Sequence, residues 1–199
     1  MQKRLARVHH GGVGARSQLC NRCQTILPPV SFLYMHLLVV RHGVAEERET
    51  WAPKDDGLRP LTDAGKKKMK EAAKGLRALV PRIDVLATSP LTRAKQTATI
   101  LAKAYDKGAP VLVDALAPGQ RPPALLPWLR TQATQKTVAI VGHEPGLGSL
   151  VSWLTAGSER SFMELGKGGA SLLDLGERIE AGDAMLFWLL RPSHLRSLG

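Results

Sequence analysis

From residue 35 onward, short apolar runs alternate with longer segments of helical periodicity, and this alternation constrains the fold more than any other feature. Strands that alternate with helices are typical of a largely parallel sheet with helices packed on both faces. We therefore expect an α/β fold, a three-layer α/β/α sandwich. The pattern predicts strands at 37–40, 84–87, 111–113, 137–141, 170–175 and 184–190, and helices at 62–79, 91–105, 124–130 and 145–155.

Single positions support these assignments. The run Leu37–Val40 is apolar and rich in β-branched residues, as in a strand that is buried on both faces. Thr62 is a good N-cap for the helix that follows it, and Pro81 ends that helix. The last two strands are joined by the short connection 176–182, which is too short for a parallel crossover. The mostly parallel sheet should therefore carry antiparallel strands at its C-terminal end.

The composition fits one globular domain and is unusual only in its charge. The chain has 199 residues, of which 44% are hydrophobic, and no run approaches the 18 apolar residues of a membrane-spanning helix. The net charge of +11 favours anionic partners such as phosphates or nucleic acid. Aromatic residues make up only 5% and do not interleave with arginines, so we expect no nucleic-acid partner. Because no apolar run is long enough to span a membrane, we expect no membrane partner either.

Residues 1–34 differ in kind from the rest. They carry five positive charges and no acidic residue, and removing these five from +11 leaves +6 for residues 35–199. We expect a basic N-terminal extension without stable structure, followed by one domain at 35–199. A targeting peptide and an upstream start codon, with Met35 as the functional start, are the alternatives. Pro28 and Pro29 interrupt the apolar stretch that a cleaved signal would need.

Both cysteines of the chain, Cys20 and Cys23, lie in this extension. A structural zinc ion needs four ligands, and the only other nearby candidates are His9 and His10. We therefore expect no metal site there. The rest of the chain has no cysteine, which fits a reducing compartment, and we expect a cytoplasmic protein.

Charged and imidazole side chains follow three of the predicted strands. Arg41 and His42 follow the first strand, Arg93 falls in the first helical turn after the second, and His143 follows the fourth. In open α/β sheets, ligands bind beyond the carboxyl ends of the strands. Helix N-termini attract anions, and the arginine fork matches phosphate oxygens. The sequence therefore predicts a phosphoryl-binding site at this rim.

His42 is the most informative of these residues. At a strand end, beside Arg41 and Gly43, a histidine can act as a nucleophile, as a base or as a metal ligand. The rim lacks further histidines and carboxylates at metal-ligand spacing, which argues against a metal. A nucleophilic role needs a neutral ring with one nitrogen free and the other N–H held by a partner.

Four segments occur in a fixed order along the chain. They are Arg41-His42-Gly43, Arg59-Pro60-Leu61-Thr62-x-x-Gly65, Thr88-Ser89-Pro90-Leu91-x-Arg93-Ala94-x-Gln96-Thr97-Ala98 and Gly142-His143-Glu144-Pro145-Gly146. In this order they resemble the histidine phosphatase superfamily, also called phosphoglycerate mutase-like, over residues 35–190. The Arg-Pro-Leu-Thr segment and the compact length resemble the SixA branch of phosphohistidine phosphatases.

The resemblance implies a phosphoglycerate mutase-like fold and a role for each site residue. His42 would be the nucleophile that is phosphorylated and then hydrolysed. Arg41, Arg93 and His143 would bind the phosphoryl oxygens, with no metal or cofactor. Glu144 would be either the general acid or a cap on the following helix, and both interpretations stay open.

The resemblance predicts a metal-independent phosphatase, a hydrolase with a phosphohistidine intermediate. We expect phosphohistidine on a protein as the substrate, with a small phosphate ester as the alternative. Arg93 and His143 are 50 positions apart, and predicted strands and helices fill that stretch, so little is left for a lid. A mutase fits the sequence less well, because the segment after Gly43 lacks a mutase-like continuation. A non-catalytic phosphate-binding module fits less well, because both arginines and both histidines are present.

Overall fold

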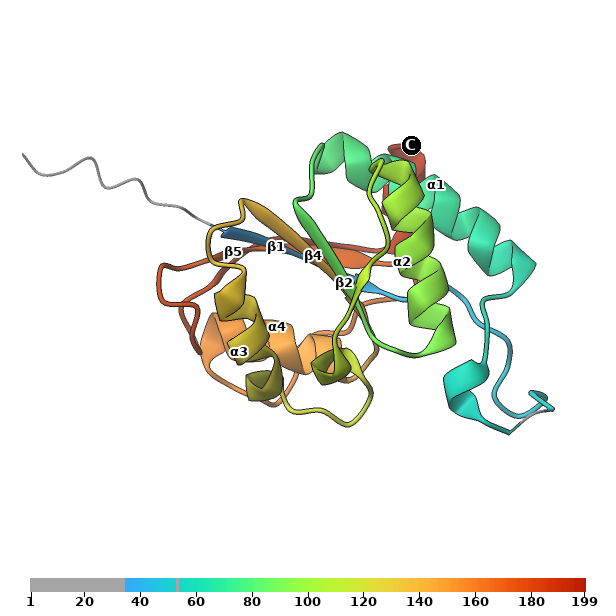
Figure 1. Cartoon of the computed structure of the whole chain (residues 1–199), viewed down its shortest axis with the longest axis horizontal. Helices are drawn as coiled ribbons and strands as arrows, with labels where there is room; N and C mark the ends of the chain where they lie inside the picture. Colours follow the sequence, from blue (N-terminus) through green and yellow to red (C-terminus); the bar gives the residue numbers. More distant parts are fainter. Residues whose placement is uncertain (1–34, 53) are drawn as a thin grey trace, which may run out of the picture. The chain divides into compact units, whose positions relative to one another are not determined.

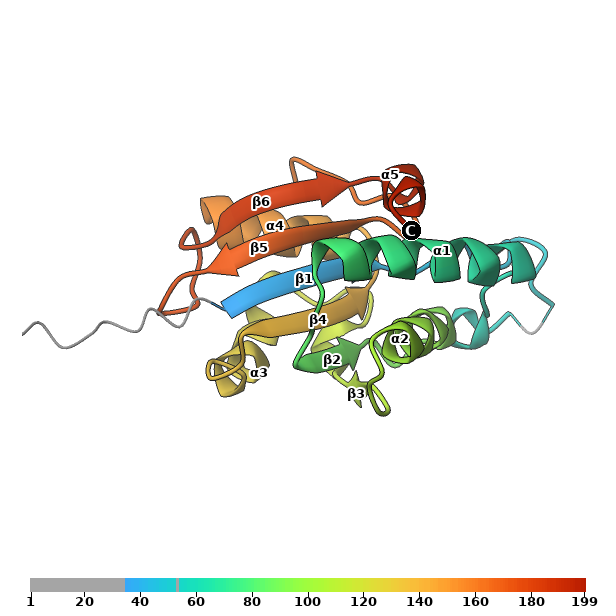
Figure 2. The same cartoon turned by 90° about the horizontal axis from the view of Figure 1, so that it is seen from above.

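A computed structural model describes residues 35–52 and 54–199, so the expected extension at 1–34, with Cys20 and Cys23, lies outside the described residues. The described part of the chain contains a six-stranded sheet with the order β3-β2-β4-β1-β5-β6 (Figure 2). The strands are β1 (Met35–Arg41), β2 (Val85–Thr88), β3 (Val111–Leu112), β4 (Thr137–Gly142), β5 (Ala170–Leu175) and β6 (Met185–Leu190).

The sheet is mixed in the way the sequence predicts. β1 and β2 pair with β4 in parallel, and β3 pairs with β2 in parallel. β5 runs antiparallel to β1, and β6 runs antiparallel to β5. The expectation of a mostly parallel sheet with antiparallel strands at its C-terminal end is therefore confirmed.

Helices cover both faces of the sheet, which gives the three layers visible in Figure 1. One face packs against α1 (Asp63–Leu79), α2 (Thr92–Ala104) and α5 (Pro192–Ser197). The other face packs against α3 (Leu126–Thr131) and α4 (Gly146–Ala156). Each face of the sheet has its own hydrophobic core. Successive side chains of β1 pack into one core and then the other, because side chains along a strand alternate between its two faces. Leu38 lies in the first core, and Leu37 and Val39 lie in the second.

Local chemistry explains where the helices begin. The Thr62 hydroxyl accepts a hydrogen bond from the backbone N–H of Gly65, so this predicted N-cap is confirmed. A Cβ at Gly65 would lie 2.0 Å from the Val44 carbonyl oxygen. Because glycine has no Cβ, α1 can lie this close to the segment after β1. None of the described helices is long and apolar enough to cross a membrane.

The structure adds short elements that the periodicity did not predict. They are α5 and three 3-10 turns, η1 (Asp56–Leu58), η2 (Asp114–Leu116) and η3 (Pro122–Leu125). Elements of three to six residues are too short to show a helical period, which needs a window of about 11–18 residues. All the predicted strands and helices are present, and their ends differ from the prediction by at most two residues. For example, β2 ends at Thr88, one residue beyond the expected end.

Candidate active site

The carboxyl ends of β1, β4 and β2 are neighbours in the sheet, and they bring the sequence-predicted site residues to one pocket. Arg41 is the last residue of β1, His42 follows it, Arg93 lies in the first turn of α2, and His143 follows β4. Five residues that the sequence did not single out as site residues also line the pocket. The whole lining is Arg41, His42, Arg48, Asp56, Arg59, Arg93, Pro118, His143, Glu144 and Lys167.

The His42 ring is held in a single orientation by its own loop. Its Nδ1 lies 2.7 Å from the Gly43 carbonyl oxygen, and a carbonyl can only accept, so Nδ1 carries the proton. The ring is 6% exposed. Burial, reinforced by the charges of Arg93 and Arg41 against the opposing hydrogen bond to Gly43, lowers the pKa of His42 to about 4. At neutral pH, Nε2 therefore carries the lone pair that a nucleophile needs.

His143 faces the same pocket from β4. Its Nε2 lies 2.8 Å from the Ser89 hydroxyl oxygen, and its buried Nδ1 has no hydrogen-bond partner among the described residues. Burial, and then the charges of His42 and Arg93, lower the pKa of His143 to about 3. The ring is thus neutral at pH 7 and offers one ring nitrogen to a ligand.

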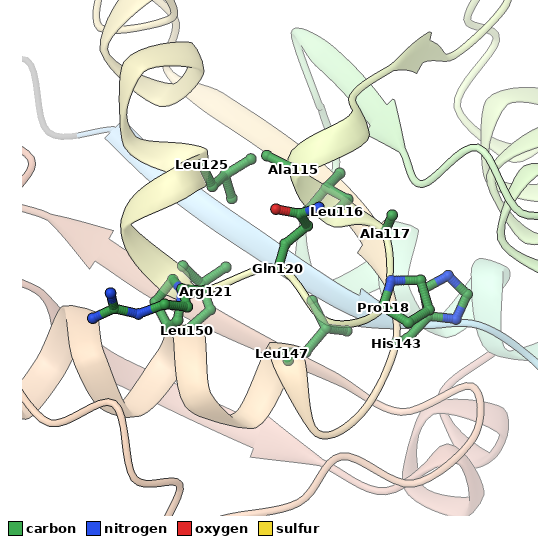
Figure 3. A pocket seen from close by; sticks show the side chains of 12 residues that line it. Ala115, Leu116, Ala117, Pro118, Gln120, Arg121, Leu125, His143, Leu147 and Leu150 are labelled. Atoms are coloured by element: carbon green, nitrogen blue, oxygen red, sulfur yellow. The ribbon is translucent and has the colours of Figure 1, made fainter.

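A mostly apolar pocket lies beside His143, as Figure 3 shows, and Pro118 and His143 line both pockets. Leu116 from η2 and Leu147 from α4 are among its apolar walls. These apolar side chains line the space on one side of the His143 imidazole.

The two arginines bind the protein through their terminal nitrogens. Arg93, which is 4% exposed, donates from Nη1 to the Asp56 carbonyl oxygen at 2.7 Å and from Nη2 to the Asp56 carboxylate at 2.9 Å. Arg41 donates from Nη1 to the Leu165 carbonyl oxygen and to Glu164. The Nε of each arginine is buried and has no partner within the described part of the chain.

The arrangement suits an oxyanion with several oxygens. Buried donors cost free energy unless an acceptor meets them, and charge-assisted bonds to phosphate oxygens are among the strongest. The Nε groups of Arg41 and Arg93 are two such unpartnered donors, and the Nδ1 of His143 is a third in the tautomer in which the Ser89 hydroxyl donates to Nε2. A phosphoryl group in front of His42 would give these atoms acceptors. In residues 35–52 and 54–199, no group of three His, Cys, Asp or Glu side chains is placed to hold a metal ion.

Backbone and hydroxyl contacts hold the loop after β1 in place. The Thr97 hydroxyl accepts from the Gly43 N–H at 3.1 Å and donates to the Arg93 carbonyl oxygen at 2.8 Å, so it joins the loop after β1 to α2. The N–H of Gly168 approaches the carbonyl oxygens of both Arg41 and His42, at 3.2 and 2.9 Å. Gly168 has a φ of +83°, a conformation that favours glycine.

Glu144 acts as a cap in this structure. Its Oε2 accepts from the Gly148 N–H in the first turn of α4 at 3.2 Å, and its Oε1 accepts from the Leu165 N–H at 2.9 Å. Burial raises the pKa of Glu144, while these two hydrogen bonds oppose the shift. Of the two interpretations that the sequence left open, the contacts match the helix cap.

Of the lining residues that the sequence did not single out, Asp56 makes the most contacts with the site arginines. Its carboxylate meets Arg48, Arg59 and Arg93, at 3.2, 2.9 and 2.9 Å. Burial opposes ionisation, but the hydrogen bonds from Arg48 and Arg59 and the charge of Arg93 hold the pKa of Asp56 well below its usual range. Arg59 belongs to a segment that the sequence did single out, whereas nothing in the local pattern marks Asp56.

Comparisons with known proteins match a sequence family and the fold described above. The model of the histidine phosphatase superfamily (branch 1) matches residues 37–117. An uncharacterized protein of Picosynechococcus sp. is 38% identical over 165 residues, which cover 81% of this chain and 99% of that protein.

Solved structures share the fold at lower identity. The protein histidine phosphatase SixA, complexed with tungstate, has a TM-score of 0.70 at 22% identity and covers 81% of this chain and 99% of its own. A phosphoserine phosphatase mutant of Entamoeba histolytica in complex with phosphoserine has a TM-score of 0.59 at 18% identity, over 81% and 99%. A mycobacterial glucosyl-3-phosphoglycerate phosphatase has a TM-score of 0.60 at 13% identity, over 79% and 98%. These likenesses concern the fold.

Proposed function

Because this chain belongs to the histidine phosphatase superfamily, we propose that it removes phosphoryl groups from phosphohistidine on a protein through a covalent phosphoenzyme at His42. One observation carries the proposal. The Nε2 of His42 is free because Gly43 holds Nδ1, and the unpartnered nitrogens of Arg41, Arg93 and His143 belong to the same pocket.

The reaction takes two displacements at phosphorus. First, the lone pair of His42 Nε2 forms a bond to phosphorus while the bond to the substrate imidazole breaks and its electron pair leaves with that ring. Water then forms a new bond to phosphorus while the bond to Nε2 breaks. The two protons of this water stay on the phosphate, which leaves as inorganic phosphate, and the electron pair of the broken bond returns to Nε2 of His42. In each transition state charge spreads over the three equatorial phosphoryl oxygens, where Arg41 and Arg93 stabilise it.

The carboxylates of the pocket favour an imidazole leaving group. An alkoxide needs a proton from a general acid, which typically contributes about 10²–10⁴-fold. Asp56 stays ionised because its pKa is held low, and both oxygens of Glu144 accept backbone hydrogen bonds. A phosphorylated imidazole has a second ring nitrogen that can take a proton from water, so the ring can leave in its neutral form. Such a substrate needs little help from an acid on the enzyme.

The chain between α2 and β4 leaves the site accessible. It forms β3, η2, η3 and α3, and of these described residues only Pro118 lines the pocket. This supports the expectation that no lid helix is inserted there. A side chain carried on a protein surface can then approach the two histidines.

A small phosphate ester is the second candidate substrate, and one observation favours it. Glu144 lines the pocket and burial raises its pKa, which is the direction that a general acid requires. If the carboxyl group exchanged one backbone hydrogen bond for a leaving oxygen, ester hydrolysis would become efficient.

The test compares kcat/KM for a protein phosphorylated on histidine with kcat/KM for several sugar and nucleotide monophosphates. The same measurements on His42→Ala give the background without a nucleophile. We expect the phosphohistidine protein to be preferred by at least about tenfold. A small ester that is preferred by that margin would overturn the substrate assignment. No turnover of any phosphate, including a generic aryl phosphate, would indicate a non-catalytic phosphate-binding module.

A further inference from the structure

The Asp56 residue holds one end of the Arg93 side chain with two different acceptors. The Asp56 carbonyl oxygen accepts from Nη1 at 2.7 Å, and carboxylate Oδ2 accepts from Nη2 at 2.9 Å. The other carboxylate oxygen, Oδ1, accepts from the Nε of Arg59 at 2.9 Å and from the Nε of Arg48 at 3.2 Å. Asp56 thus connects three arginines that line the pocket.

The two hydrogen bonds that the Nη atoms of Arg93 donate to Asp56 fix the direction of the Nε–H bond of Arg93. A guanidinium group is planar, so two anchored Nη atoms also set the plane and the direction of the Nε–H bond. That Nε is buried and meets no acceptor in the described chain, and Arg93 lines the pocket together with His42 and His143. The side chain therefore presents its Nε edge rather than its Nη pair.

We propose that Asp56 is a positioning residue for phosphoryl transfer, which holds Arg93 so that its Nε–H meets a phosphoryl oxygen bound in front of His42. Asp56 itself touches neither the phosphoryl group nor the leaving group. The inference rests on the proposed function of the His42 site. It adds to that function a residue of the η1 turn, 37 positions before Arg93.

The negative charge of Asp56, taken by itself, predicts that Asp56 weakens phosphate binding, whereas a positioning role predicts that it strengthens phosphate binding. The two predictions differ in sign, so the inference can be tested. Asp56 and Glu144 are the carboxylates among the described lining residues, which also include Arg41, Arg48, Arg59, Arg93 and Lys167. Like charges repel, so a carboxylate beside the pocket disfavours a bound phosphate. If Asp56 acted only through its charge, its removal would tighten phosphate binding. If Asp56 positions Arg93, its removal weakens phosphate binding although the pocket becomes more positive.

The experiment uses the full chain with Asp56→Ala, and with Asp55→Ala as the matched control. Asp55 is the N-cap of the same turn, where its carboxylate accepts from the Gly57 N–H at 2.8 Å, and the hydrogen bonds of the Arg93 Nη atoms go to Asp56 instead. Two quantities are measured, the Kd of inorganic phosphate by calorimetry and kcat/KM with a generic aryl phosphate. We expect Asp56→Ala to lose at least tenfold in both, and Asp55→Ala to stay within about twofold of the wild type.

A double-mutant cycle separates positioning from a general loss of structure. If Asp56 acts through Arg93, Asp56→Ala costs almost nothing further in the Arg93→Ala background, because contacting residues that work as a unit are not additive. Additive losses would overturn the inference, and so would unchanged or tighter phosphate binding in Asp56→Ala. Asp56→Asn, which keeps an oxygen that can accept from Arg93, should fall between the wild type and Asp56→Ala, and it replaces Asp56→Ala if the latter does not fold.

The same measurements keep this inference apart from the proposed function. If the wild type binds phosphate but hydrolyses neither an aryl phosphate nor a phosphohistidine protein, the proposed function fails, and the phosphate Kd values still decide the role of Asp56. If the wild type does not bind inorganic phosphate, the positioning role fails as well.

Discussion

The imidazole rings of His42 and His143 face each other with their centroids 5.0 Å apart and their planes inclined by 53°. They come from the ends of β1 and β4, which are paired in parallel. Two imidazolium ions at this distance would repel each other strongly, and each ring is also buried near arginines. The pair is therefore held in its neutral form, which is the form that the proposed reaction uses.

The first prediction concerns pH. The folded-state pKa values of His42, about 4, and His143, about 3, lie below the 6.5 of an unfolded chain. The unfolded chain therefore binds protons first as the pH falls, so both rings contribute stability that is present above pH 6.5. This stability is lost down to about pH 4 for His42 and about pH 3 for His143. Titration of the ring signals by NMR should show both midpoints well below 6.5. A midpoint near 6.5 for the signal that disappears in His42→Ala would contradict the environment described for His42.

The second prediction is a covalent phosphate on His42. After a rapid acid-free quench in denaturant, labelled phosphate should stay on the protein, and the bond should be labile in acid and stable in base. His42→Ala should trap none and lose nearly all turnover. His194→Ala, a change at an exposed histidine of α5, should behave as the wild type. If His42→Ala keeps more than about a tenth of the activity, a barrier change below about 1.4 kcal/mol, His42 is not the nucleophile.

The third prediction is that Arg93→Ala harms catalysis more than folding. Loss of one charge-assisted contact to the transition state should raise the barrier by about 2–4 kcal/mol, by analogy with the removal of an oxyanion donor. Arg82→Ala is the control, because Arg82 is an exposed arginine whose partner, Asp84, lies outside the pocket. Comparison of kcat/KM with the unfolding midpoint of each variant separates the two effects. An unchanged kcat/KM, or a variant that only fails to fold, would refute the assignment.

The fourth prediction separates the two roles of Glu144. In Glu144→Gln, the amide offers one acceptor oxygen where the carboxylate offers two, and its NH₂ group would face one of the backbone N–H donors of Gly148 and Leu165. We expect a lower Tm and little change in kcat for a phosphohistidine protein. A selective collapse of ester hydrolysis with an unchanged Tm would instead identify Glu144 as the general acid.

The fifth prediction concerns the contact between α1 and α5. A Cβ at Gly75 would lie 1.8 Å from the Leu195 carbonyl oxygen, so Gly75→Ala forces the two helices apart. Overpacking of this kind typically costs about 1–3 kcal/mol. Gly108→Ala is the matched control, since a Cβ there meets nothing within 4 Å. Equal free energies of unfolding for the two variants would show that α5 does not pack as described.

Two kinds of element could be predicted from the sequence. These are elements long enough to show a periodic pattern of apolar residues, and elements that begin at a recognisable capping residue. β1 has a continuous apolar run, and α1 has a cap at Thr62 and five apolar positions at helical spacing. α5 and η1 could not be predicted this way, because neither spans enough residues for a period to show. Their positions depend on tertiary contacts, such as the one between Leu195 and Gly75.

The site residues that directly follow a strand could be predicted from the sequence. Arg41, His42, Arg93 and His143 each follow a strand, and the parallel pairing of β1, β4 and β2 brings them together. Asp56 lies in a turn between β1 and α1, and its link to Arg93 is made only by the folded chain. The sequence could not decide whether Glu144 is a general acid or a helix cap, because a carboxylate after a strand can either face the ligand or cap the next helix.

The hydrogen bonds from Gly168 to the carbonyl oxygens of Arg41 and His42 have a consequence for how the chain can be divided. Arg41 and His42 lie at the end of β1, whereas Arg93 follows β2 and His143 follows β4. Gly168, which holds the carbonyl groups of Arg41 and His42, lies shortly before β5. A contiguous segment that holds all of these parts must run at least from residue 41 to residue 168. A shorter fragment such as 37–117 would carry His42 and Arg93 without His143 or Gly168, so activity should be a property of the undivided domain and should return only when complementary fragments reassemble the sheet.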